Sequence, residues 1–453
     1  VGGGTLLANN GGAGGSVTVT AGGANHNVSI GSIDATGGNA LAGGTAGAGK
    51  AVIVTAANGY VQQVPGGWFN GASVAVTANQ GIGAGTGAGD LSQRLGIIPV
   101  TGTAQNKNAG AAGSVRVIYG GGAVNLVGAQ VQNASTTGDL DIATSSGALT
   151  VNGLGRNGAG NISLSAGGGN DLTINASSTL SAIDGNIRLE AGRDVIFTGN
   201  ASAQTNTGDI YVSAGGSIQQ AGTSTALTAN NLALRAGNRI GDGTGGDNVI
   251  NTSVNALSAT AGGGIAISNN KALTIGAVTF GGGTVPGGVI GGVLGQGPGN
   301  VFVGTTSGAL ILDSNVIVTD GDLALSGATD LTVNGSAESF SRATQLTAGT
   351  GSISGTGAVG AGALTATAAT GISLTANVAM LTATSTSGPI AMTLTNGAAV
   401  ENVSTTGTVN LTATAGNLGV KTISGSDVTL AAAAGAINDA NGTDNNITAN
   451  TLT

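Results

Sequence analysis

Residues 208–218 read Gly-Asp-Ile-Tyr-Val-Ser-Ala-Gly-Gly-Ser-Ile, and they hold the pattern that decides the fold. Apolar and polar residues alternate in the first half of this segment, which is typical of a strand buried on one face. The glycines that follow permit the backbone of a tight corner, and an apolar residue then opens a second strand. The segment therefore predicts two short strands joined by a corner.

The same pattern recurs through the middle of the chain at a nearly constant spacing. Equivalent segments occupy 138–143, 160–165, 185–190, 208–213 and 230–235, and their first apolar residues are Leu140, Ile162, Ile187, Ile210 and Leu232, at steps of 22, 25, 23 and 22 residues. The motif continues at Leu257, Leu323, Leu346, Leu364, Leu381, Val409, Val428 and Ile447. A repeat of about 20 residues with short strands and glycine corners predicts one turn of a parallel β-helix.

This repeat predicts an all-β fold, a parallel β-helix or β-solenoid of roughly 20 coils with little or no α-helix. Coils stack at about 4.8 Å. Leu, Ile, Val and Ala are expected to point inward, and Thr, Ser and Asn to form hydrogen-bonded ladders outside. We expect residues 1–453 to form one continuous rod segment, with loop excursions near 58–73, 79–113 and 281–300, where the rhythm breaks.

Composition excludes several other classes of protein. Glycine supplies 88 of 453 residues, charged residues are 7%, aromatic residues are 2%, and cysteine is absent. Without cysteine the chain has no disulfides and no thiolate zinc sites. A sequence pI near 4.4 argues against nucleic acid as a partner, because that partner requires clustered Lys and Arg. No apolar stretch of about 18 residues occurs, so no membrane-spanning helix is predicted.

The repeat sequence resembles that of filamentous-haemagglutinin-like adhesins. These adhesins are large exoproteins of Gram-negative bacteria, and many of them are exported by two-partner secretion. The resemblance rests on residues 208–218, on Arg-Ala-Gly-Asn-Arg-Ile-Gly at 235–241 and on residues 250–267, and it is clearest from about 114 to 447. It implies a right-handed β-helix that belongs to the shaft of a secreted or surface-exposed protein. The implied location is extracellular or on the outer cell surface of a Gram-negative bacterium.

Three aromatic residues gather near the amino terminus, although aromatic residues are scarce elsewhere. Tyr60, Trp68 and Phe69 lie within ten residues of one another. Exposed aromatic faces stack on sugars or anchor a protein partner, so these three residues are the candidate contact site for a glycan or a partner. The alternative is that the loop folds its aromatic side chains back over the wall of the coil. The strand pattern places two other aromatic residues, Phe197 and Phe302, in the core.

The residues that could support catalysis or metal binding are dispersed. The densest acidic group comprises Asp313, Asp320, Asp322 and Asp330, and Asp322 precedes an apolar strand residue as a corner residue does. The single histidine, His26, has no evident partners for a triad. Gly167–Leu172 departs from the calcium-binding nonapeptide by one position and does not repeat. We therefore predict no catalytic residues, no cofactor and no metal site.

Together these observations predict a structural protein rather than an enzyme. The expected role is the shaft of an adhesin or extracellular filament that mediates adhesion or forms a fibrous surface layer, such as in a biofilm. Expected partners are copies of the same chain, end to end or side by side, or glycans of host or cell surfaces. Two alternatives remain: a glycan- or partner-binding β-helix module, and an enzyme that acts on polysaccharides.

Overall fold

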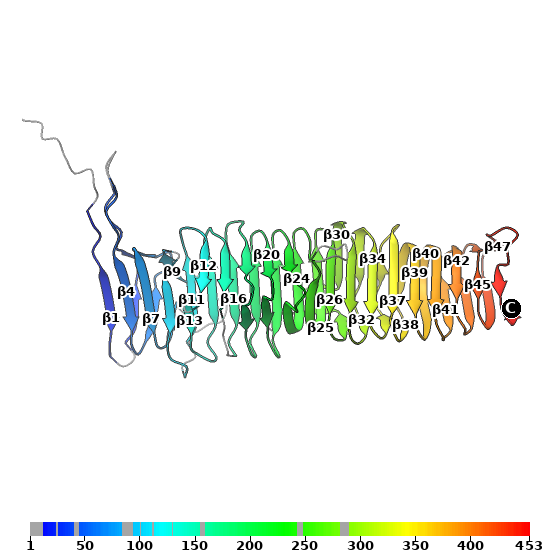
Figure 1. The fold of residues 1–453 in the computed structure, drawn as a ribbon, viewed down its shortest axis with the longest axis horizontal. Coiled ribbons are helices and arrows are strands. Elements are labelled where there is room, and N and C mark those ends of the chain that lie inside the picture. Colours follow the sequence, from blue (N-terminus) through cyan, green and yellow to red (C-terminus); the bar gives the residue numbers. More distant parts are fainter. Residues whose placement is uncertain are drawn as a thin grey trace, which may run out of the picture. The chain divides into compact units, whose positions relative to one another are not determined.

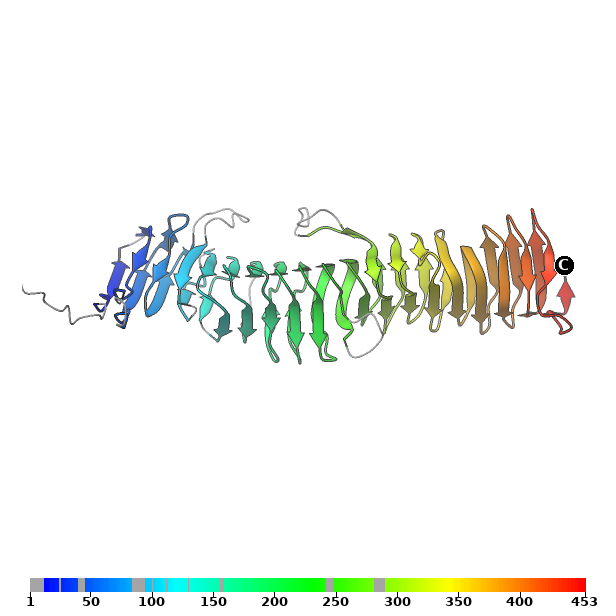
Figure 2. The ribbon, with the colours of Figure 1, turned by 90° about the horizontal axis from the view of Figure 1, so that it is seen from above.

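The fold is all-β and repeats through the whole described chain. The computed structural model describes residues 12–23, 26–39, 45–83, 94–99, 101–110, 113–128, 130–154, 159–241, 248–280 and 290–453. These residues contain no helix and form a parallel β-solenoid of about 17 turns, which confirms the predicted fold class and comes close to the predicted number of coils. The chain divides into two compact units, residues 1–208 and 209–453. Strands lie side by side within each unit (Figures 1 and 2).

The first unit contains three parallel stacks of strands over its early coils. One stack holds β1 (Val17–Ala21), β4 (Ala51–Ala56), β7 (Ser73–Ala78), β10 (Thr103–Asn106) and β13 (Val131–Asn133). A second holds β2 (Val28–Ile30), β5 (Tyr60–Gln63), β8 (Gly81–Ile82), β11 (Val115–Tyr119), β14 (Leu140–Thr144), β16 (Ile162–Ala166) and β19 (Ile187–Ala191). A third holds β3 (Ile33–Asp34), β6 (Phe69–Asn70) and β9 (Leu95–Ile98), and β9 also pairs with β11.

The later coils of the first unit add two further stacks. One holds β12 (Val124–Val127), β15 (Leu149–Asn152), β17 (Leu172–Ile174) and β20 (Val195–Thr198), and the other holds β18 (Thr179–Ser181) and β21 (Ser202–Gln204). Leu140 pairs with Ile162, and Ile162 pairs with Ile187. The register predicted from the motif is therefore confirmed across these coils.

The second unit continues the same architecture with longer strands that turn corners without a break. Its strands up to β38 include β22 (Asp209–Ala214), β23 (Ile218–Ala221), β24 (Leu227–Ala236), β25 (Ile250–Ala261), β26 (Ile265–Asn269), β27 (Leu273–Ile275), β30 (Val293–Pro298), β31 (Val301–Thr305), β32 (Leu310–Leu312), β33 (Val316–Asp320), β34 (Leu323–Gly327), β35 (Leu331–Val333), β36 (Ala337–Glu338), β37 (Ala343–Ala348) and β38 (Ser352–Ser354). From β39 they are β39 (Ala358–Ala368), β40 (Gly371–Ser385), β41 (Ile390–Leu394), β42 (Ala398–Ser404), β43 (Val409–Ala413), β44 (Leu418–Val420), β45 (Ile423–Ser424), β46 (Asp427–Ala432), β47 (Ile437–Asp439), β48 (Ile447–Thr448) and β49 (Thr451–Leu452).

A short antiparallel pair projects from this pattern in the second unit. β28 (Ala277–Val278) pairs with β29 (Ile290–Gly291). Val278 and Phe280 pack against outward residues of the coil wall, and the ring centroids of Phe280 and Tyr211 lie 5.9 Å apart. Aromatic contacts at this distance and tilt are favourable, so the pair covers Tyr211, which is 1% exposed.

The core is a series of inward columns of Leu, Ile, Val and Ala, as predicted. In the second unit the motif gives the right register at Leu364–Leu381 and Val409–Val428. It is wrong at four steps: Leu323–Leu346, Leu346–Leu364, Leu381–Val409 and Val428–Ile447. Leu364 pairs with Thr344, not with Leu346. Thr344 is buried, and its hydroxyl is satisfied by the Ser339 hydroxyl at 2.8 Å. Val428 pairs with Leu452, whereas Ile447 pairs with another strand. A polar residue can occupy an inward position when its hydrogen bond is made.

Glycine columns let successive corners approach closely. A Cβ on Gly138 would lie 2.1 Å from the carbonyl oxygen of Gly113, and one on Gly208 would lie 2.1 Å from that of Gly185. No side chain fits at such distances, so stacking at the repeat distance requires glycine at these corners. In the Gly-Asp and Gly-Asn pairs that begin each motif, the first residue is therefore glycine because a larger side chain would clash with the neighbouring corner.

The second residue of each pair links one coil to the next. Asp139 Oδ1 accepts a hydrogen bond from the backbone N of Asn161 at 3.1 Å, and Asn161 Oδ1 accepts one from Asn186 N at 2.9 Å. In the second unit Asp322 Oδ1 accepts from Ala343 N in the same way, at 3.1 Å. These side chains satisfy backbone donors that the corner leaves unpaired.

The three predicted excursions differ in what the structure describes. Residues 58–73 contain strands β5 and β6 with a turn between them. Within 79–113, strands β8, β9 and β10 belong to the coil, whereas residues 84–93, 100 and 111–112 lie outside the described residues. Within 281–300, residues 290–291 and 293–298 are strand, and 281–289 lie outside the described residues.

Candidate functional site

The three candidate aromatic residues do not form one exposed face. Phe69 has no exposed surface and lies in the core, where it pairs with Ile33 and Ile97 of neighbouring coils. Tyr60 and Trp68 are half-buried. Phe69 is therefore unable to contact a partner, because the alternation of its strand points its side chain inward.

Trp68 covers the outer wall of its own unit. A Cβ on Gly96 would lie 2.8 Å from Trp68 Cε3, and one on Gly120 would lie 2.8 Å from Trp68 Cζ3. The indole thus lies on two glycines of successive coils, whose missing side chains make room for it. This is the alternative arrangement considered above, in which an aromatic side chain folds back over the wall.

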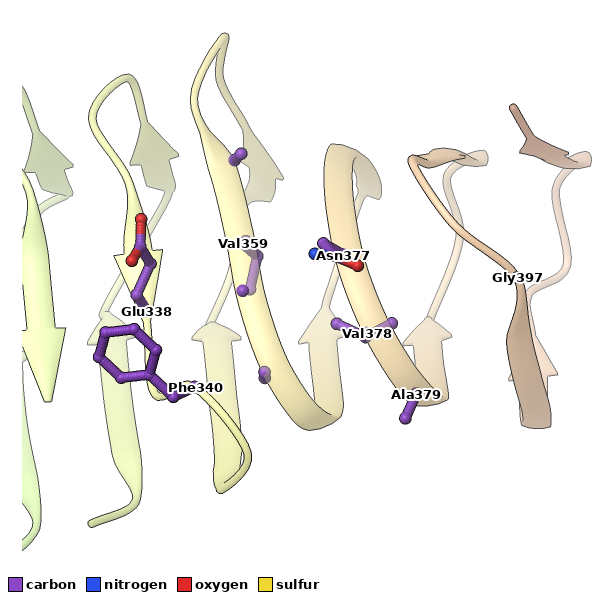
Figure 3. A pocket seen from close by; sticks show the side chains of 10 residues that line it. Glu338, Phe340, Val359, Asn377, Val378, Ala379 and Gly397 are labelled. Carbon is purple, nitrogen blue, oxygen red and sulfur yellow. The ribbon is translucent and has the colours of Figure 1, made fainter. Parts of the chain in front are cut away.

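A groove on the outer wall of the second unit presents an exposed aromatic residue that the sequence reasoning did not single out. Its volume is about 600 Å³, and residues of β36, β39, β40 and the following turns line it, among them Glu338, Phe340, Gly360, Asn377, Ala379 and Gly397 (Figure 3). We call it the wall groove. Phe340 is 56% exposed. The available signal was a lone aromatic residue between serines, in Ser339-Phe340-Ser341.

The register of three successive coils builds the wall groove. Glu338 pairs with Gly360, and Gly360 pairs with Asn377. Because paired residues point to the same face, the carboxylate and the carboxamide flank a position that has no side chain. Successive coils are about 4.8 Å apart, so the two side chains project from the same wall about 10 Å apart. Gly360 forms the floor between them.

Asn377 is held in one orientation. Its Oδ1 accepts a hydrogen bond from Asn396 Nδ2 at 2.8 Å. The Nδ2 group consequently points toward the groove, as Figure 3 shows. Neither this Nδ2 nor the Glu338 carboxylate has a hydrogen-bond partner within the described part of the chain. The groove therefore offers a donor on one wall and an acceptor on the other.

Phe340 occupies an unfavourable backbone conformation. Its φ is +46°, and Arg342 N donates to Ser339 O at 2.9 Å, which closes a four-residue turn around it. A positive φ at this position of a turn favours glycine or asparagine. Strain of this kind persists where the surrounding structure imposes it and is concentrated at functional sites.

A second group of polar residues lies on the wall of the first unit, and its charges are paired. Arg94 donates two hydrogen bonds of 2.8 Å to the carboxylate of Asp141, and Arg116 lies 3.4 Å from Asp139. Asp141 is 4% exposed and Arg116 is 5% exposed. Because each carboxylate already has a guanidinium partner, this arrangement stabilises the wall and leaves no carboxylate free for chemistry.

Arg94 owes its place to a split strand. Ile82 of β8 pairs with Val115, and Leu95 of β9 pairs with Val117, so β8 and β9 both pair with β11. Arg94 directly precedes Leu95, and its guanidinium reaches past β11 to Asp141 of β14. The sequence showed a break in rhythm here, but the partner of Arg94 depends on the register of β14.

The acidic residues that were weighed for catalysis act as corner residues. Asp330 accepts from Ser352 N at 2.8 Å, Asp313 accepts from Asn334 Nδ2 at 2.9 Å, and Asp320 pairs with Arg342 at 2.8 Å. Across the described ranges no three His, Asp or Glu side chains gather as a metal site would require.

Phe197 has no exposed surface, as predicted, but the expectation for Phe302 is wrong. Val301 and Val303 take the inward positions of β31, and Phe302 between them lies half-buried on the outer wall.

Among the described residues no helix reaches the length and apolar character that crossing a bilayer demands.

Comparison of the chain with protein-family models, curated proteins and solved structures gives no match.

Proposed function

We propose that this chain is a structural shaft of a secreted or surface-exposed bacterial adhesin or extracellular filament, and that it has no catalytic role. The observation that carries the proposal is a column of hydroxyl side chains on the wall of the second unit. The column runs through Ser326, Thr347, Thr367, Thr384, Ser404, Ser424 and Thr448, one residue in each successive coil.

Such a wall suits a load-bearing or fibrous role. Small uncharged side chains at one register give a smooth surface, and cross-strand hydroxyl pairs add to the stability of the sheet. Each coil contacts its neighbours, so the fold extends by repetition without a larger core. Low charge on these faces also permits side-by-side association with other copies of the chain. The resemblance of residues 208–218 to filamentous-haemagglutinin-like repeats supports an extracellular location on a Gram-negative cell.

The test is to locate the chain on the cells that make it. Antibodies against the folded chain should label intact cells or the culture medium, and protease added outside should remove the label. Cells from which the coding sequence is deleted should adhere less to surfaces and to each other. Labelling only after lysis, with adhesion unchanged in the deletion strain, would refute the proposal.

A further inference from the structure

We infer that the wall groove binds a neutral pyranose ring of an oligosaccharide, which stacks on Phe340 and exchanges hydrogen bonds with Glu338 and Asn377. The inference goes beyond the shaft role proposed above, and it does not depend on where the chain resides. It concerns a different part of the molecule from Tyr60, Trp68 and Phe69.

The polar groups of the groove match a ligand that both donates and accepts. Glu338 presents an acceptor, and the Nδ2 of Asn377 presents a donor from the opposite wall, fixed by the bond from Asn396. Hydroxyl groups can donate to the first and accept from the second. An ammonium or guanidinium group would satisfy Glu338 but would meet the Asn377 donor with no acceptor.

The aromatic side chain supplies the apolar half of the site. Phe340 is 56% exposed, and its turn holds it at a φ of +46°. The turn sets the backbone that carries the ring, and the exposed ring offers a flat apolar face to a ligand. A pyranose has the matching character, because its C–H groups form an apolar face and its hydroxyl groups lie at the edge.

The dimensions favour one ring over an extended peptide. Phe340 follows Glu338 by two residues, in the turn after β36, so their Cα atoms lie at most about 7 Å apart. The walls are two coil spacings apart, about 10 Å. Three residues of extended peptide already span about 10 Å. In addition, the backbone of β39 at the floor pairs with β36 on one side and β40 on the other, so it cannot pair with an added strand.

Charge selects among saccharides. Among the residues that line the groove, Glu338 is the one with an acidic side chain. A uronic acid or sulfated sugar would bring a like charge to this carboxylate, which is unfavourable. We therefore expect neutral oligosaccharides to bind and acidic ones to be excluded.

Two substitutions separate binding from folding. Phe340→Gly removes the ring and relieves the positive φ, so it should leave the unfolding midpoint unchanged or raise it. Gly360→Leu fills the floor, where the nearest atom to an added Cβ is Glu338 Cγ at 3.4 Å. Gly419→Leu is the matched control, because an added Cβ there meets only Ala440 Cβ at 3.7 Å and Gly419 does not line the groove.

The experiment measures binding to the full chain by saturation-transfer-difference NMR and calorimetry. The probes are cellopentaose, maltopentaose and chitopentaose, with a heparin-derived pentasaccharide and an oligogalacturonate as acidic probes. At least one neutral probe should bind. Phe340→Gly and Gly360→Leu should weaken that binding by about tenfold or more. Gly419→Leu should bind as the parent does, and Glu338→Gln should admit the acidic probes.

Several outcomes would overturn the inference. These are no binding of any neutral probe at about 10 mM, equal binding by Phe340→Gly and Gly360→Leu, or tighter binding of the acidic probes by the parent chain. Binding of a lysine-containing peptide without any oligosaccharide would overturn it as well. Because these measurements use purified chain, their failure is distinct from a failure of the cell-surface test.

Discussion

The two units bury the same kind of core but use their outer walls differently. In the first unit, Arg94 pairs with Asp141 and Arg116 lies close to Asp139, so charged side chains are buried on the wall. In the second unit, the wall from β34 onward carries small hydroxyl side chains and glycines, with exposed groups such as Phe340 at the turns.

This difference shows that the inward and outward positions of a solenoid are subject to different constraints. Inward positions must fill a coil of nearly constant section, so they accept few residue types. Outward positions are limited only by their neighbours in the coils above and below. Specialisation therefore accumulates on the wall, and the wall is where each unit should be probed.

The largest expected effect concerns the inward columns, which should be equivalent in both units. Ile187→Asp and Leu381→Asp each place a carboxylate at a position with no exposed surface. An unpaired buried charge should lower the free energy of unfolding by about 4 kcal/mol in either unit. Outward controls Thr150→Asp and Thr382→Asp should change it by less than about 0.5 kcal/mol.

Urea unfolding of the four variants, with hydrogen exchange to locate the affected coils, checks this expectation. A solenoid can lose one group of coils without the rest, so exchange should rise near the substituted coil first. Equal stability of an inward variant and its outward control would show that the register assigned to that unit is incorrect.

The second prediction contrasts a buried ion pair with an exposed one. Asp141→Asn leaves two guanidinium groups in the wall of the first unit with one carboxylate, and should cost about 3 kcal/mol. Glu401→Gln removes the partner of Lys421 in the second unit, where the side chains are 32% and 45% exposed. That pair should contribute less than about 1 kcal/mol.

Salt separates the two cases further. Raising the ionic strength to about 1 M should remove most of the effect of Glu401→Gln and little of the effect of Asp141→Asn, since buried pairs are screened less. Unfolding midpoints in urea at low and high salt provide the measurement. Equal salt dependence would mean that the Arg94–Asp141 pair is accessible to solvent.

The third prediction contrasts two glycines of different purpose. Gly138→Ala brings a Cβ to within 2.1 Å of the Gly113 carbonyl oxygen and should cost about 2 kcal/mol through forced displacement. Gly360→Ala meets only Glu338 Cγ at 3.4 Å and should be neutral or slightly stabilising, because the unfolded chain loses freedom. Thermal unfolding of both variants measures the two effects. A similar loss of stability in both would show that Gly138 and Gly360 do not differ in their packing.

Much of the fold was predictable because the inward columns repeat in the sequence. The spacing of Leu140, Ile162 and Ile187 gave the register of the first unit directly. It failed at Thr344, since a buried hydroxyl does not look like a core residue in a hydropathy pattern. It also failed at Phe302, where two flanking valines took the inward positions and left the larger side chain outside.

The wall groove was not predictable from the sequence. Its shape depends on Gly360 lying between Glu338 and Asn377, which are close only because 22 and 17 residues separate the paired positions along the chain. Phe340 has no aromatic neighbour in the sequence, so nothing in the sequence marks it as part of a site. In contrast, the proximity of Tyr60, Trp68 and Phe69 in the sequence predicts a contact site, although strand alternation directs Phe69 inward.

The smallest expected effect is a pH dependence that belongs to the first unit. Hydrogen bonding from Arg193 lowers the pKa of Asp171 below its ordinary value of 3.8, and the Asp194 backbone N–H contributes to the same shift. A carboxylate with a lowered folded-state pKa stabilises the fold above its unfolded-state pKa. That contribution should be lost as the pH falls below 3.8 and through the folded-state pKa. Arg193 is 63% exposed, so the effect should be smaller than any above.

The parent chain should therefore lose more stability than Asp171→Asn between about pH 6 and pH 2. Thermal unfolding at both values measures the difference, and an identical pH dependence in the two chains would show that Asp171 does not contribute to acid sensitivity.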